Sequence, residues 1–418
     1  MSDATTTAAI DQPFTLPNGT VLGNRLVKAA LSEQLGTLRN APTRQLETLY
    51  RRWSAGRFGL VITGNVMVDR RALGEPRNVV VEDERDLSRL QAWASAARVG
   101  GNAAWVQINH PGRQSPRVLS DHPVAPSPVG LKISGQFARP RALTSPEIHE
   151  IIDRFATTAA IAVKAGFDGV QIHSAHGYLS SQFLSPITNQ RTDEWGGDPE
   201  RRMRFLLEVV RATRERIGPE AGLGVKLNSA DFQRGGFTEE ESMGVVDALS
   251  AEGHLDLLEI SGGTYEKAAM MGVVKEQRES TKQREAYFLD YAEAVRTRAS
   301  MPLMLTGGLR SRTAMDEALA GGAIDLVGLG RPTCVDPAIA GKLIDGTLPA
   351  IPPARELQIG VKTLDDLSEL TWYTTQLWRL GRGKDAAAQR HPAPAVAEYL
   401  AQTVFGGATR RLQRPPRY

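Results

Sequence analysis

Cysteine is almost absent from this chain, since Cys334 is the only one among 418 residues. A single thiol excludes an intramolecular disulfide. It also excludes a zinc site or an iron–sulfur cluster held by four thiolates of this chain. A chain with so little cysteine is typical of a reducing compartment.

A charge excess and a long apolar run are missing as well. Lys and Arg total 50, Asp and Glu total 47, and the net charge of +3 argues against a nucleic-acid or acidic-membrane partner. No run of about 18 apolar residues suggests a membrane span, and the first ten residues do not resemble a signal peptide. We therefore expect a soluble, cytoplasmic protein, and 41% apolar residues are enough for a sizeable core.

Eight short strand-like runs alternate along the chain with longer helical patterns. Helices are expected over 148–165, 200–217 and 239–252, and Thr144 with Pro146 and Glu147 forms a good helix start. Eight strand–helix units favour a parallel (β/α)8 TIM barrel over a doubly wound sheet. The expected strands are 26–30, 60–64, 104–108, 169–172, 223–227, 257–260, 303–306 and 326–329.

Two kinds of segment interrupt this repeat. Near the amino terminus, Asn18-Gly19 separates two short apolar runs and predicts a hairpin, which we place as a plug over the barrel floor. The connections 109–143 and 261–289 are unusually long, and loops of this length inside a compact domain are usually functional. Both are expected to overhang the catalytic face.

The barrel is expected to occupy residues 1–340, and residues 341–418 to form a helical extension. A helix is indicated there by apolar residues at three- and four-residue spacing, which would pack on the barrel or form a subunit interface in a homo-oligomer. The basic tail 409–418 is expected to be a solvated or partner-contacting terminus. The apolar stripe consists of Leu367, Leu370, Tyr373, Leu377 and Leu380, with Trp372 and Trp378 beside it.

His173, His176 and Tyr178 follow the fourth strand, and in a β/α barrel that strand end lies on the catalytic face. Two neutral imidazoles can donate N–H groups to an anion or to a polarised carbonyl, and a phenol can deliver a proton. The trio indicates reduction or isomerisation of a carbonyl-activated substrate. The His-x-x-His spacing could instead hold a metal, although no carboxylate or third histidine lies beside it, or the rings could fill the core.

Glycines end the seventh and eighth strands, where barrels often bind phosphate. Gly307 and Gly308 follow strand seven, and Gly330 precedes Arg331 after strand eight. Glycine lets backbone N–H groups approach phosphate oxygens, and the guanidinium adds a charged fork. The alternative interpretation is a pair of tight strand-to-helix turns.

Two further polar residues lie on expected strands. Gln107 offers an amide donor and acceptor that suit the edge of a heterocycle. Lys226 lies on a buried run, where an ammonium is costly without an anionic partner. It could pair with an electron-rich cofactor, or act as a Schiff-base lysine.

Several motifs together resemble the Old Yellow Enzyme family, the FMN-binding NADH:flavin oxidoreductases. Residues 176–197 look like the family signature, and residues 198–206 extend the match. The motifs Leu22-Gly-Asn-Arg-Leu-Val, Gln107-Ile-Asn-His-Pro-Gly-Arg and Gly328-Leu-Gly-Arg-Pro fit the same family. The resemblance covers about residues 12 to 340.

The resemblance implies a barrel that binds FMN non-covalently, is reduced by NADH or NADPH, and reduces alkenes activated by a carbonyl or nitro group. His173 and His176 would bind the activating oxygen of the substrate, and Tyr178 would donate the proton. Gln107 would face the flavin pyrimidine ring. The remaining FMN contacts would come from Ala30, Leu31, Ser32, Gly64, Lys226, Gly307, Gly308, Gly330 and Arg331.

The chain departs from the family pattern in three respects. Ser32 replaces the usual cysteine or threonine after strand one, and Lys226 replaces the usual arginine of strand five, so a compact ammonium replaces a fork. One cysteine excludes the larger iron–sulfur branch. Two alternatives stay open from the residues: a Schiff-base lyase that uses Lys226, and a flavin-binding module without ene-reductase activity.

Overall fold

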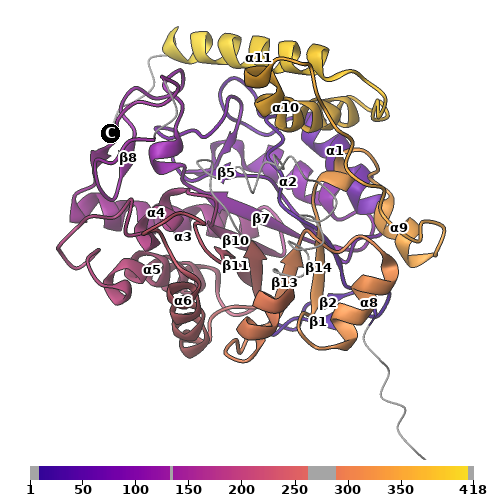
Figure 1. The fold of residues 1–418 in the computed structure, drawn as a ribbon, viewed down its shortest axis with the longest axis horizontal. Helices are drawn as coiled ribbons and strands as arrows, with labels where there is room; N and C mark the ends of the chain where they lie inside the picture. The colour runs from indigo at the N-terminus through magenta and orange to yellow at the C-terminus, as the bar shows by residue number, and fades with distance from the viewer. Residues whose placement is uncertain (1–8, 132–134, 262–288, 413–418) are drawn as a thin grey trace, which may run out of the picture.

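Eight parallel strands close into a barrel, as the sequence predicted (Figure 1). The computed structural model describes residues 9–131, 135–261 and 289–412. Each barrel strand pairs in parallel with the next, and β14 pairs back onto β3 with Val327 opposite Leu26. In barrel order the strands are β3 (Leu26–Lys28), β4 (Leu60–Ile62), β7 (Ala103–Asn109), β10 (Gly169–Ser174), β11 (Gly222–Asn228), β12 (Leu257–Ser261), β13 (Leu303–Thr306) and β14 (Leu326–Leu329).

Helices surround the barrel and occupy the predicted positions between strands. Helix α3 begins at a capping box in which Thr144 and Glu147 bond each other's backbone N–H groups, which is the helix start predicted from the sequence. The helices are α1 (Arg44–Ala55), α2 (Leu87–Ala97), α3 (Ser145–Lys164), α4 (Leu179–Leu184), α5 (Pro199–Ile217), α6 (Glu239–Glu252), α8 (Arg312–Ala320), α9 (Ile339–Ile344), α10 (Lys362–Gly381) and α11 (Pro392–Leu412).

Short elements lie in the connections. The long connection after β7 begins at the carboxyl end of that strand and contains η2, β8 and β9, whereas residues 262–288 of the other long connection lie outside the described residues. The short elements are β5 (Val66–Met67), β6 (Val79–Val80), β8 (Val124–Ala125), β9 (Arg141–Ala142), η1 (Glu84–Asp86), η2 (Gly112–Gln114) and η4 (Arg331–Cys334).

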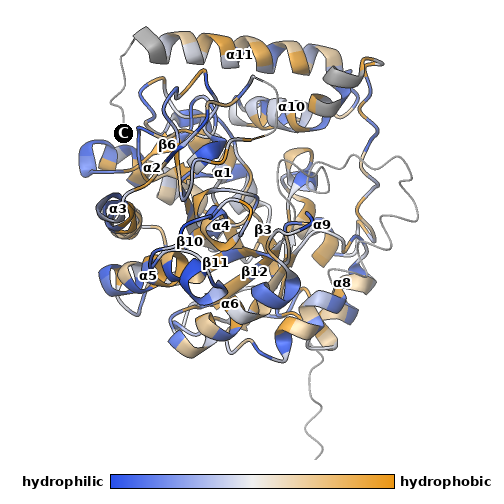
Figure 2. Ribbon diagram, turned by 60° about the vertical axis from the view of Figure 1, so that its left-hand side comes forward, coloured by the Kyte–Doolittle hydropathy of each residue, from blue (hydrophilic) through white to orange (hydrophobic). Residues whose placement is uncertain are grey.

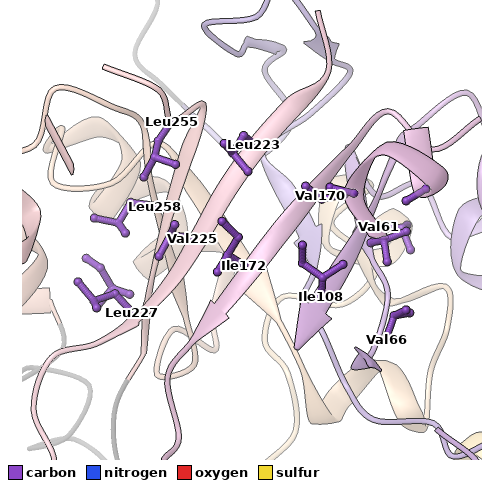
Figure 3. Packing of buried hydrophobic residues seen from close by; sticks show 14 of the residues in the cluster. Val61, Val66, Ile108, Val170, Ile172, Leu223, Val225, Leu227, Leu255 and Leu258 are labelled. Atoms are coloured by element: carbon purple, nitrogen blue, oxygen red, sulfur yellow. The ribbon is translucent and has the colours of Figure 1, made fainter. Parts of the chain in front are cut away.

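The barrel strands contribute to two apolar clusters, because successive strand residues point to opposite faces. Outward residues such as Ile172 and Val225 pack beneath the helices (Figure 3). Inside the barrel, Trp105 fills the lower end. A Cβ added at Gly222 would lie 2.2 Å from Trp105 Cζ2, so the missing side chain on β11 makes room for the indole.

The predicted hairpin forms and closes the barrel floor. Its strands β1 (Phe14–Thr15) and β2 (Val21–Leu22) pair antiparallel. Leu16 and Leu22 are fully buried against the lower interior side chains, including Trp105. The sequence prediction of a plug is therefore confirmed.

The last two helices form a layer over one side of the barrel (Figure 1). On α10, the indole N–H of Trp378 donates to the Glu33 carbonyl at 2.9 Å, which ties this helix to the loop after β3. The Trp378 ring stacks on Tyr399 of α11. Leu370, expected in the apolar stripe, is instead 40% exposed.

Sequence reasoning did not foresee α11, which carries apolar residues around much of its length (Figure 2). Gly406 explains part of its packing, since a Cβ there would lie 3.0 Å from Pro76. The subunit interface expected for this extension stays a prediction. Within the described ranges, none of the helices combines the length and the apolar content that crossing a bilayer requires.

Candidate active site

A left-handed turn positions the predicted catalytic trio at the end of β10. His176 has φ +60° and Gly177 has φ +75°, so the chain reverses sharply between strand and helix. A left-handed histidine is strained by about 1–2 kcal/mol, which the structure offsets with a bond from its backbone N–H to Asn228. The turn brings the Tyr178 ring next to the His173 ring, with their centroids 4.8 Å apart.

Both imidazoles are held neutral. Burial lowers the pKa of His173 well below 6.5, and the neighbouring His176 and Lys226 lower it further. Burial and Lys226 likewise hold the pKa of His176 well below that value. The Ala175 backbone N–H donates to His173 Nδ1 at 3.2 Å, so the neutral ring carries its proton on Nε2 and can donate it to a ligand.

The phenol of Tyr178 completes the cluster. Its side chain is buried, and its hydroxyl accepts a hydrogen bond from Asn65 Nδ2 at 3.3 Å. His176 Nε2 lies 2.7 Å from Ser261 Oγ at the end of β12. Asn65 and Ser261 were not identified from the sequence, because nothing in their local pattern marks them as neighbours of the histidines.

A chain of buried polar side chains crosses the barrel interior beneath this cluster. Gln107 Nε2 donates to Gln171 Oε1 at 2.8 Å, and Gln171 Nε2 donates to Glu259 Oε2 at 2.8 Å. Glu259 Oε1 lies 2.9 Å from Lys226 Nζ, and both side chains are almost fully buried. The register places Lys226 directly between His173 and Glu259 on adjacent strands.

This ion pair revises one expectation. Sequence reasoning left Lys226 without a protein anion and looked to a cofactor for one, whereas Glu259 supplies it. A signal was present in the sequence. Glu259 is a charge inside the apolar run 257–260, and an inward-facing charge on a neighbouring strand was the natural partner.

The two glycine loops meet at the other side of the barrel opening. Gly307 and Gly308 have φ +95° and +90°, which favours glycine, and a Cβ at Gly307 would meet no described atom within 4 Å, so the space beside this loop is open. Arg331 forms an ion pair with Glu369 of α10. Sequence reasoning missed Glu369 because it lies in the extension, 38 residues after Arg331.

The loop after β3 approaches the same opening. Leu31 contacts the Gly330 position, with 3.8 Å between its Cδ2 and a Cβ built there. Beside it lie Ala30 and Ser32, all three partly exposed. Ser32 Oγ donates to Glu75 at 2.5 Å, and burial raises the pKa of that carboxyl.

Gly64 has a packing role that the sequence did not indicate, and its expected contact with the cofactor stays a prediction. A Cβ at this position would lie 2.1 Å from the Leu31 carbonyl and 2.3 Å from Glu33 Oε2. Its backbone N–H donates to Glu33 Oε1 at 2.9 Å. Glycine at this position therefore permits the close approach of the loop after β3, whatever else the residue contacts.

Orphaned polar atoms show that this opening suits a ligand with several heteroatoms. Asn109 lies on the same face of β7 as Gln107, and both of its amide atoms are buried without a hydrogen-bond partner in the described part of the chain. The hydroxyl oxygen of Thr306 is likewise buried without a partner there. Glycine loops, a guanidinium and amide edges fit a phosphate joined to a heterocycle. No group of three metal-ligating side chains occurs among the described residues.

Comparison with known proteins identifies the family. The sequence model of the NADH:flavin oxidoreductase / NADH oxidase family matches residues 10–348. The NADH-dependent flavin oxidoreductase iliE of Hypocrea jecorina (strain QM6a) is 37% identical over 351 residues, which cover 78% of this chain and 86% of the relative. An NADH oxidase of Thermoanaerobacter brockii is 32% identical, and the match covers 49% of that longer protein.

Solved structures agree with this assignment. The old yellow enzyme homologue of Zymomonas mobilis superposes with a TM-score of 0.69 at 25% identity, covering 83% of this chain and 94% of that one. Morphinone reductase gives the same TM-score and identity, covering 84% and 93%. The chain belongs to the NADH:flavin oxidoreductase / NADH oxidase family, whose cofactor is FMN.

Proposed function

We propose that this oxidoreductase reduces the C=C bond of alkenes conjugated to a carbonyl or nitro group. The observation that carries the proposal is the convergence of two neutral imidazoles and a phenol at the end of β10. Neutral N–H donors stabilise the charge that develops on an activating oxygen during reduction. The family assignment supports the redox chemistry, and the trio supports the choice of substrate.

The residues present fit FMN. Gly307, Gly308 and Gly330 with Arg331 would hold the phosphate, and Gln107 with Lys226 would face the pyrimidine end. When bound, FMN supplies hydride chemistry between a nicotinamide, from NADH or NADPH, and the alkene. The protein positions and polarises the reactants around it.

The trio would divide the work on the substrate. His173 Nε2–H and the His176 ring would bind the activating oxygen and draw charge toward it. Tyr178 would give its phenolic proton to the carbon next to the activating group, with Asn65 holding the hydroxyl. Both imidazoles stay neutral at pH 7, so the oxygen is bound by hydrogen bonds and receives no proton from an imidazolium.

The Schiff-base alternative has less support. A Schiff-base lysine attacks as a neutral amine. Lys226 Nζ lies 2.9 Å from the buried Glu259 carboxylate, so this ion pair already engages the nitrogen that would have to attack a carbonyl.

The test separates substrate reduction from flavin reduction. Wild-type protein loaded with FMN is bleached anaerobically with NADH or NADPH, and then titrated with cyclohexenone while the visible spectrum is recorded. Tyr178→Phe should bleach at the wild-type rate and recolour about 10²–10⁴-fold more slowly. Equal recolouring rates would remove Tyr178 as the donor, and a failure of the wild type to recolour with any enone or nitroalkene would overturn the proposal.

We also propose that the extension joins two copies of the chain. Leu400, Val404 and Phe405 lie within two turns of α11 and are 40%, 69% and 62% exposed. An apolar patch on one helix is suited to the self-complementary contact of a two-fold dimer. Light scattering should find a dimer for the wild type and a monomer for Phe405→Glu, and a wild-type monomer would reject the proposal.

A further inference from the structure

Glu259 is the only member of the buried polar chain that carries a negative charge. Its side chain is 0% exposed and is fixed at both oxygens, by Gln171 on one side and Lys226 on the other. A carboxylate so deep in a barrel is costly unless it is paired and hydrogen-bonded, and here it is both. None of the roles proposed for the trio at the end of β10 involves Glu259.

We infer that Glu259 is a positioning residue that sets the charge and the orientation which the protein presents to the pyrimidine end of FMN. This inference rests on the proposed placement of Gln107 and Lys226 beside the flavin. Glu259 would act only through its neighbours, directly on Lys226 and by way of Gln171 on Gln107.

The first effect is on charge. Lys226 alone would stabilise the electron-rich reduced flavin relative to the oxidised form. Glu259 lies 2.9 Å from the ammonium and opposes most of that effect. The pair therefore presents an ammonium donor while its net charge is zero, which keeps the flavin potential lower than a lone cation would.

The second effect is on orientation. An ionised carboxylate only accepts hydrogen bonds, so Gln171 must turn its NH2 group toward Glu259. Its carbonyl then accepts from the NH2 group of Gln107. The carbonyl of Gln107 is thereby left outside this chain of bonds, as an acceptor for a ring N–H. A carboxylate that reaches Gln107 only through Gln171 thus fixes the direction of the Gln107 amide.

The decisive measurement is the midpoint potential of bound FMN in Glu259→Gln. Without the carboxylate, Lys226 acts on the flavin uncompensated. The equilibrium constant for reduction should rise at least tenfold, which is about 30 mV for two electrons. Asp256→Asn is the matched control. Asp256 is a buried acid just before the same strand, but it pairs with Arg214 at the barrel foot, so its loss should leave the potential unchanged.

A double variant tests whether the effect on the potential depends on Lys226. It also keeps the test valid if Glu259→Gln alone does not fold. In Lys226→Met the ammonium that Glu259 offsets is gone, so adding Glu259→Gln leaves no uncompensated cation beside the flavin. The upward shift should therefore disappear in the Lys226→Met background. The double variant buries no charge and is expected to fold even if Glu259→Gln alone does not, and its comparison with Lys226→Met still decides the question.

The outcomes separate this inference from the proposed function. An unchanged potential in Glu259→Gln, or an equal shift in the Lys226→Met background, overturns the role of Glu259 while alkene reduction by the wild type stands. A tenfold rise that vanishes without Lys226 establishes it. Gln171→Leu gives the second readout, because a freed Gln107 amide should weaken FMN binding, and unchanged FMN affinity would reject the orientation effect.

Discussion

Replacing Glu369 by Gln should tighten FMN binding. Arg331, expected at the FMN phosphate, is paired with the Glu369 carboxylate of α10. A phosphate dianion arriving at Arg331 meets this carboxylate as a competitor of like charge. Removing the negative charge frees the guanidinium while the amide of Gln keeps the size of the side chain.

The magnitude follows from the exposure of the pair. The side chains of Arg331 and Glu369 are 39% and 23% exposed. Ion pairs this accessible to water contribute about 0.2–1 kcal/mol. The affinity for FMN should therefore rise by no more than about fivefold, because tenfold corresponds to about 1.4 kcal/mol. The gain should shrink as salt is added.

The assay is titration of apoprotein with FMN, followed by the quenching of flavin fluorescence. Riboflavin, which lacks the phosphate, should bind equally to the wild type and Glu369→Gln. Glu398→Gln is the control variant, since Glu398 pairs with Arg382 and Arg390 on the same extension. Weaker FMN binding in Glu369→Gln, or an equal gain for riboflavin, would refute the competition between carboxylate and phosphate.

Three other outcomes are expected. His173→Ala and His176→Ala should each weaken the binding of phenols about tenfold or more, because hydrogen bonds to a charged partner contribute about 1.5–3 kcal/mol. Difference spectra measure phenol binding. Unchanged binding by both variants would contradict the assignment of the anion site. Burial lowers the pKa of His110 from 6.5 to about 4, so the unfolded chain takes up its proton first and stability should fall as the pH drops from about 6.5 to about 4. Urea unfolding should show a smaller pH-dependent loss of stability in His110→Asn than in the wild type. An identical loss would show that other groups cause it. Gly222→Ala should cost about 1–3 kcal/mol of stability because its Cβ would overlap Trp105, and a thermal melt at the wild-type temperature would mean that the indole can move aside.

The barrel itself was readable from the sequence because its signals are local. Apolar runs such as 223–227 and 303–306 mark buried parallel strands, and Asn18-Gly19 marks a tight turn wherever it occurs. The trio at the end of β10 was also readable, since three chemical groups lie within six residues of one strand end.

The parts that were missed depend on contacts between distant segments. Lys226 contacts Glu259 only because β11 and β12 are neighbours in the closed barrel, and Arg331 contacts Glu369 only because α10 packs against η4. No local sequence pattern indicates that the two members of either pair lie close together. The packing role of Gly64 was likewise hidden, because it depends on the close approach of the Leu31 carbonyl.

The hairpin plug has a kinetic consequence. Because Leu16 and Leu22 seal the lower end of the barrel, every reactant must enter and leave through the opening at the carboxyl ends of the strands. If nicotinamide and alkene use the same face of the flavin, they take turns, and the oxidised nicotinamide departs before the alkene enters. Turnover would then follow a ping-pong scheme with parallel double-reciprocal lines. An excess of alkene would slow the enzyme by occupying the position that the reductant needs.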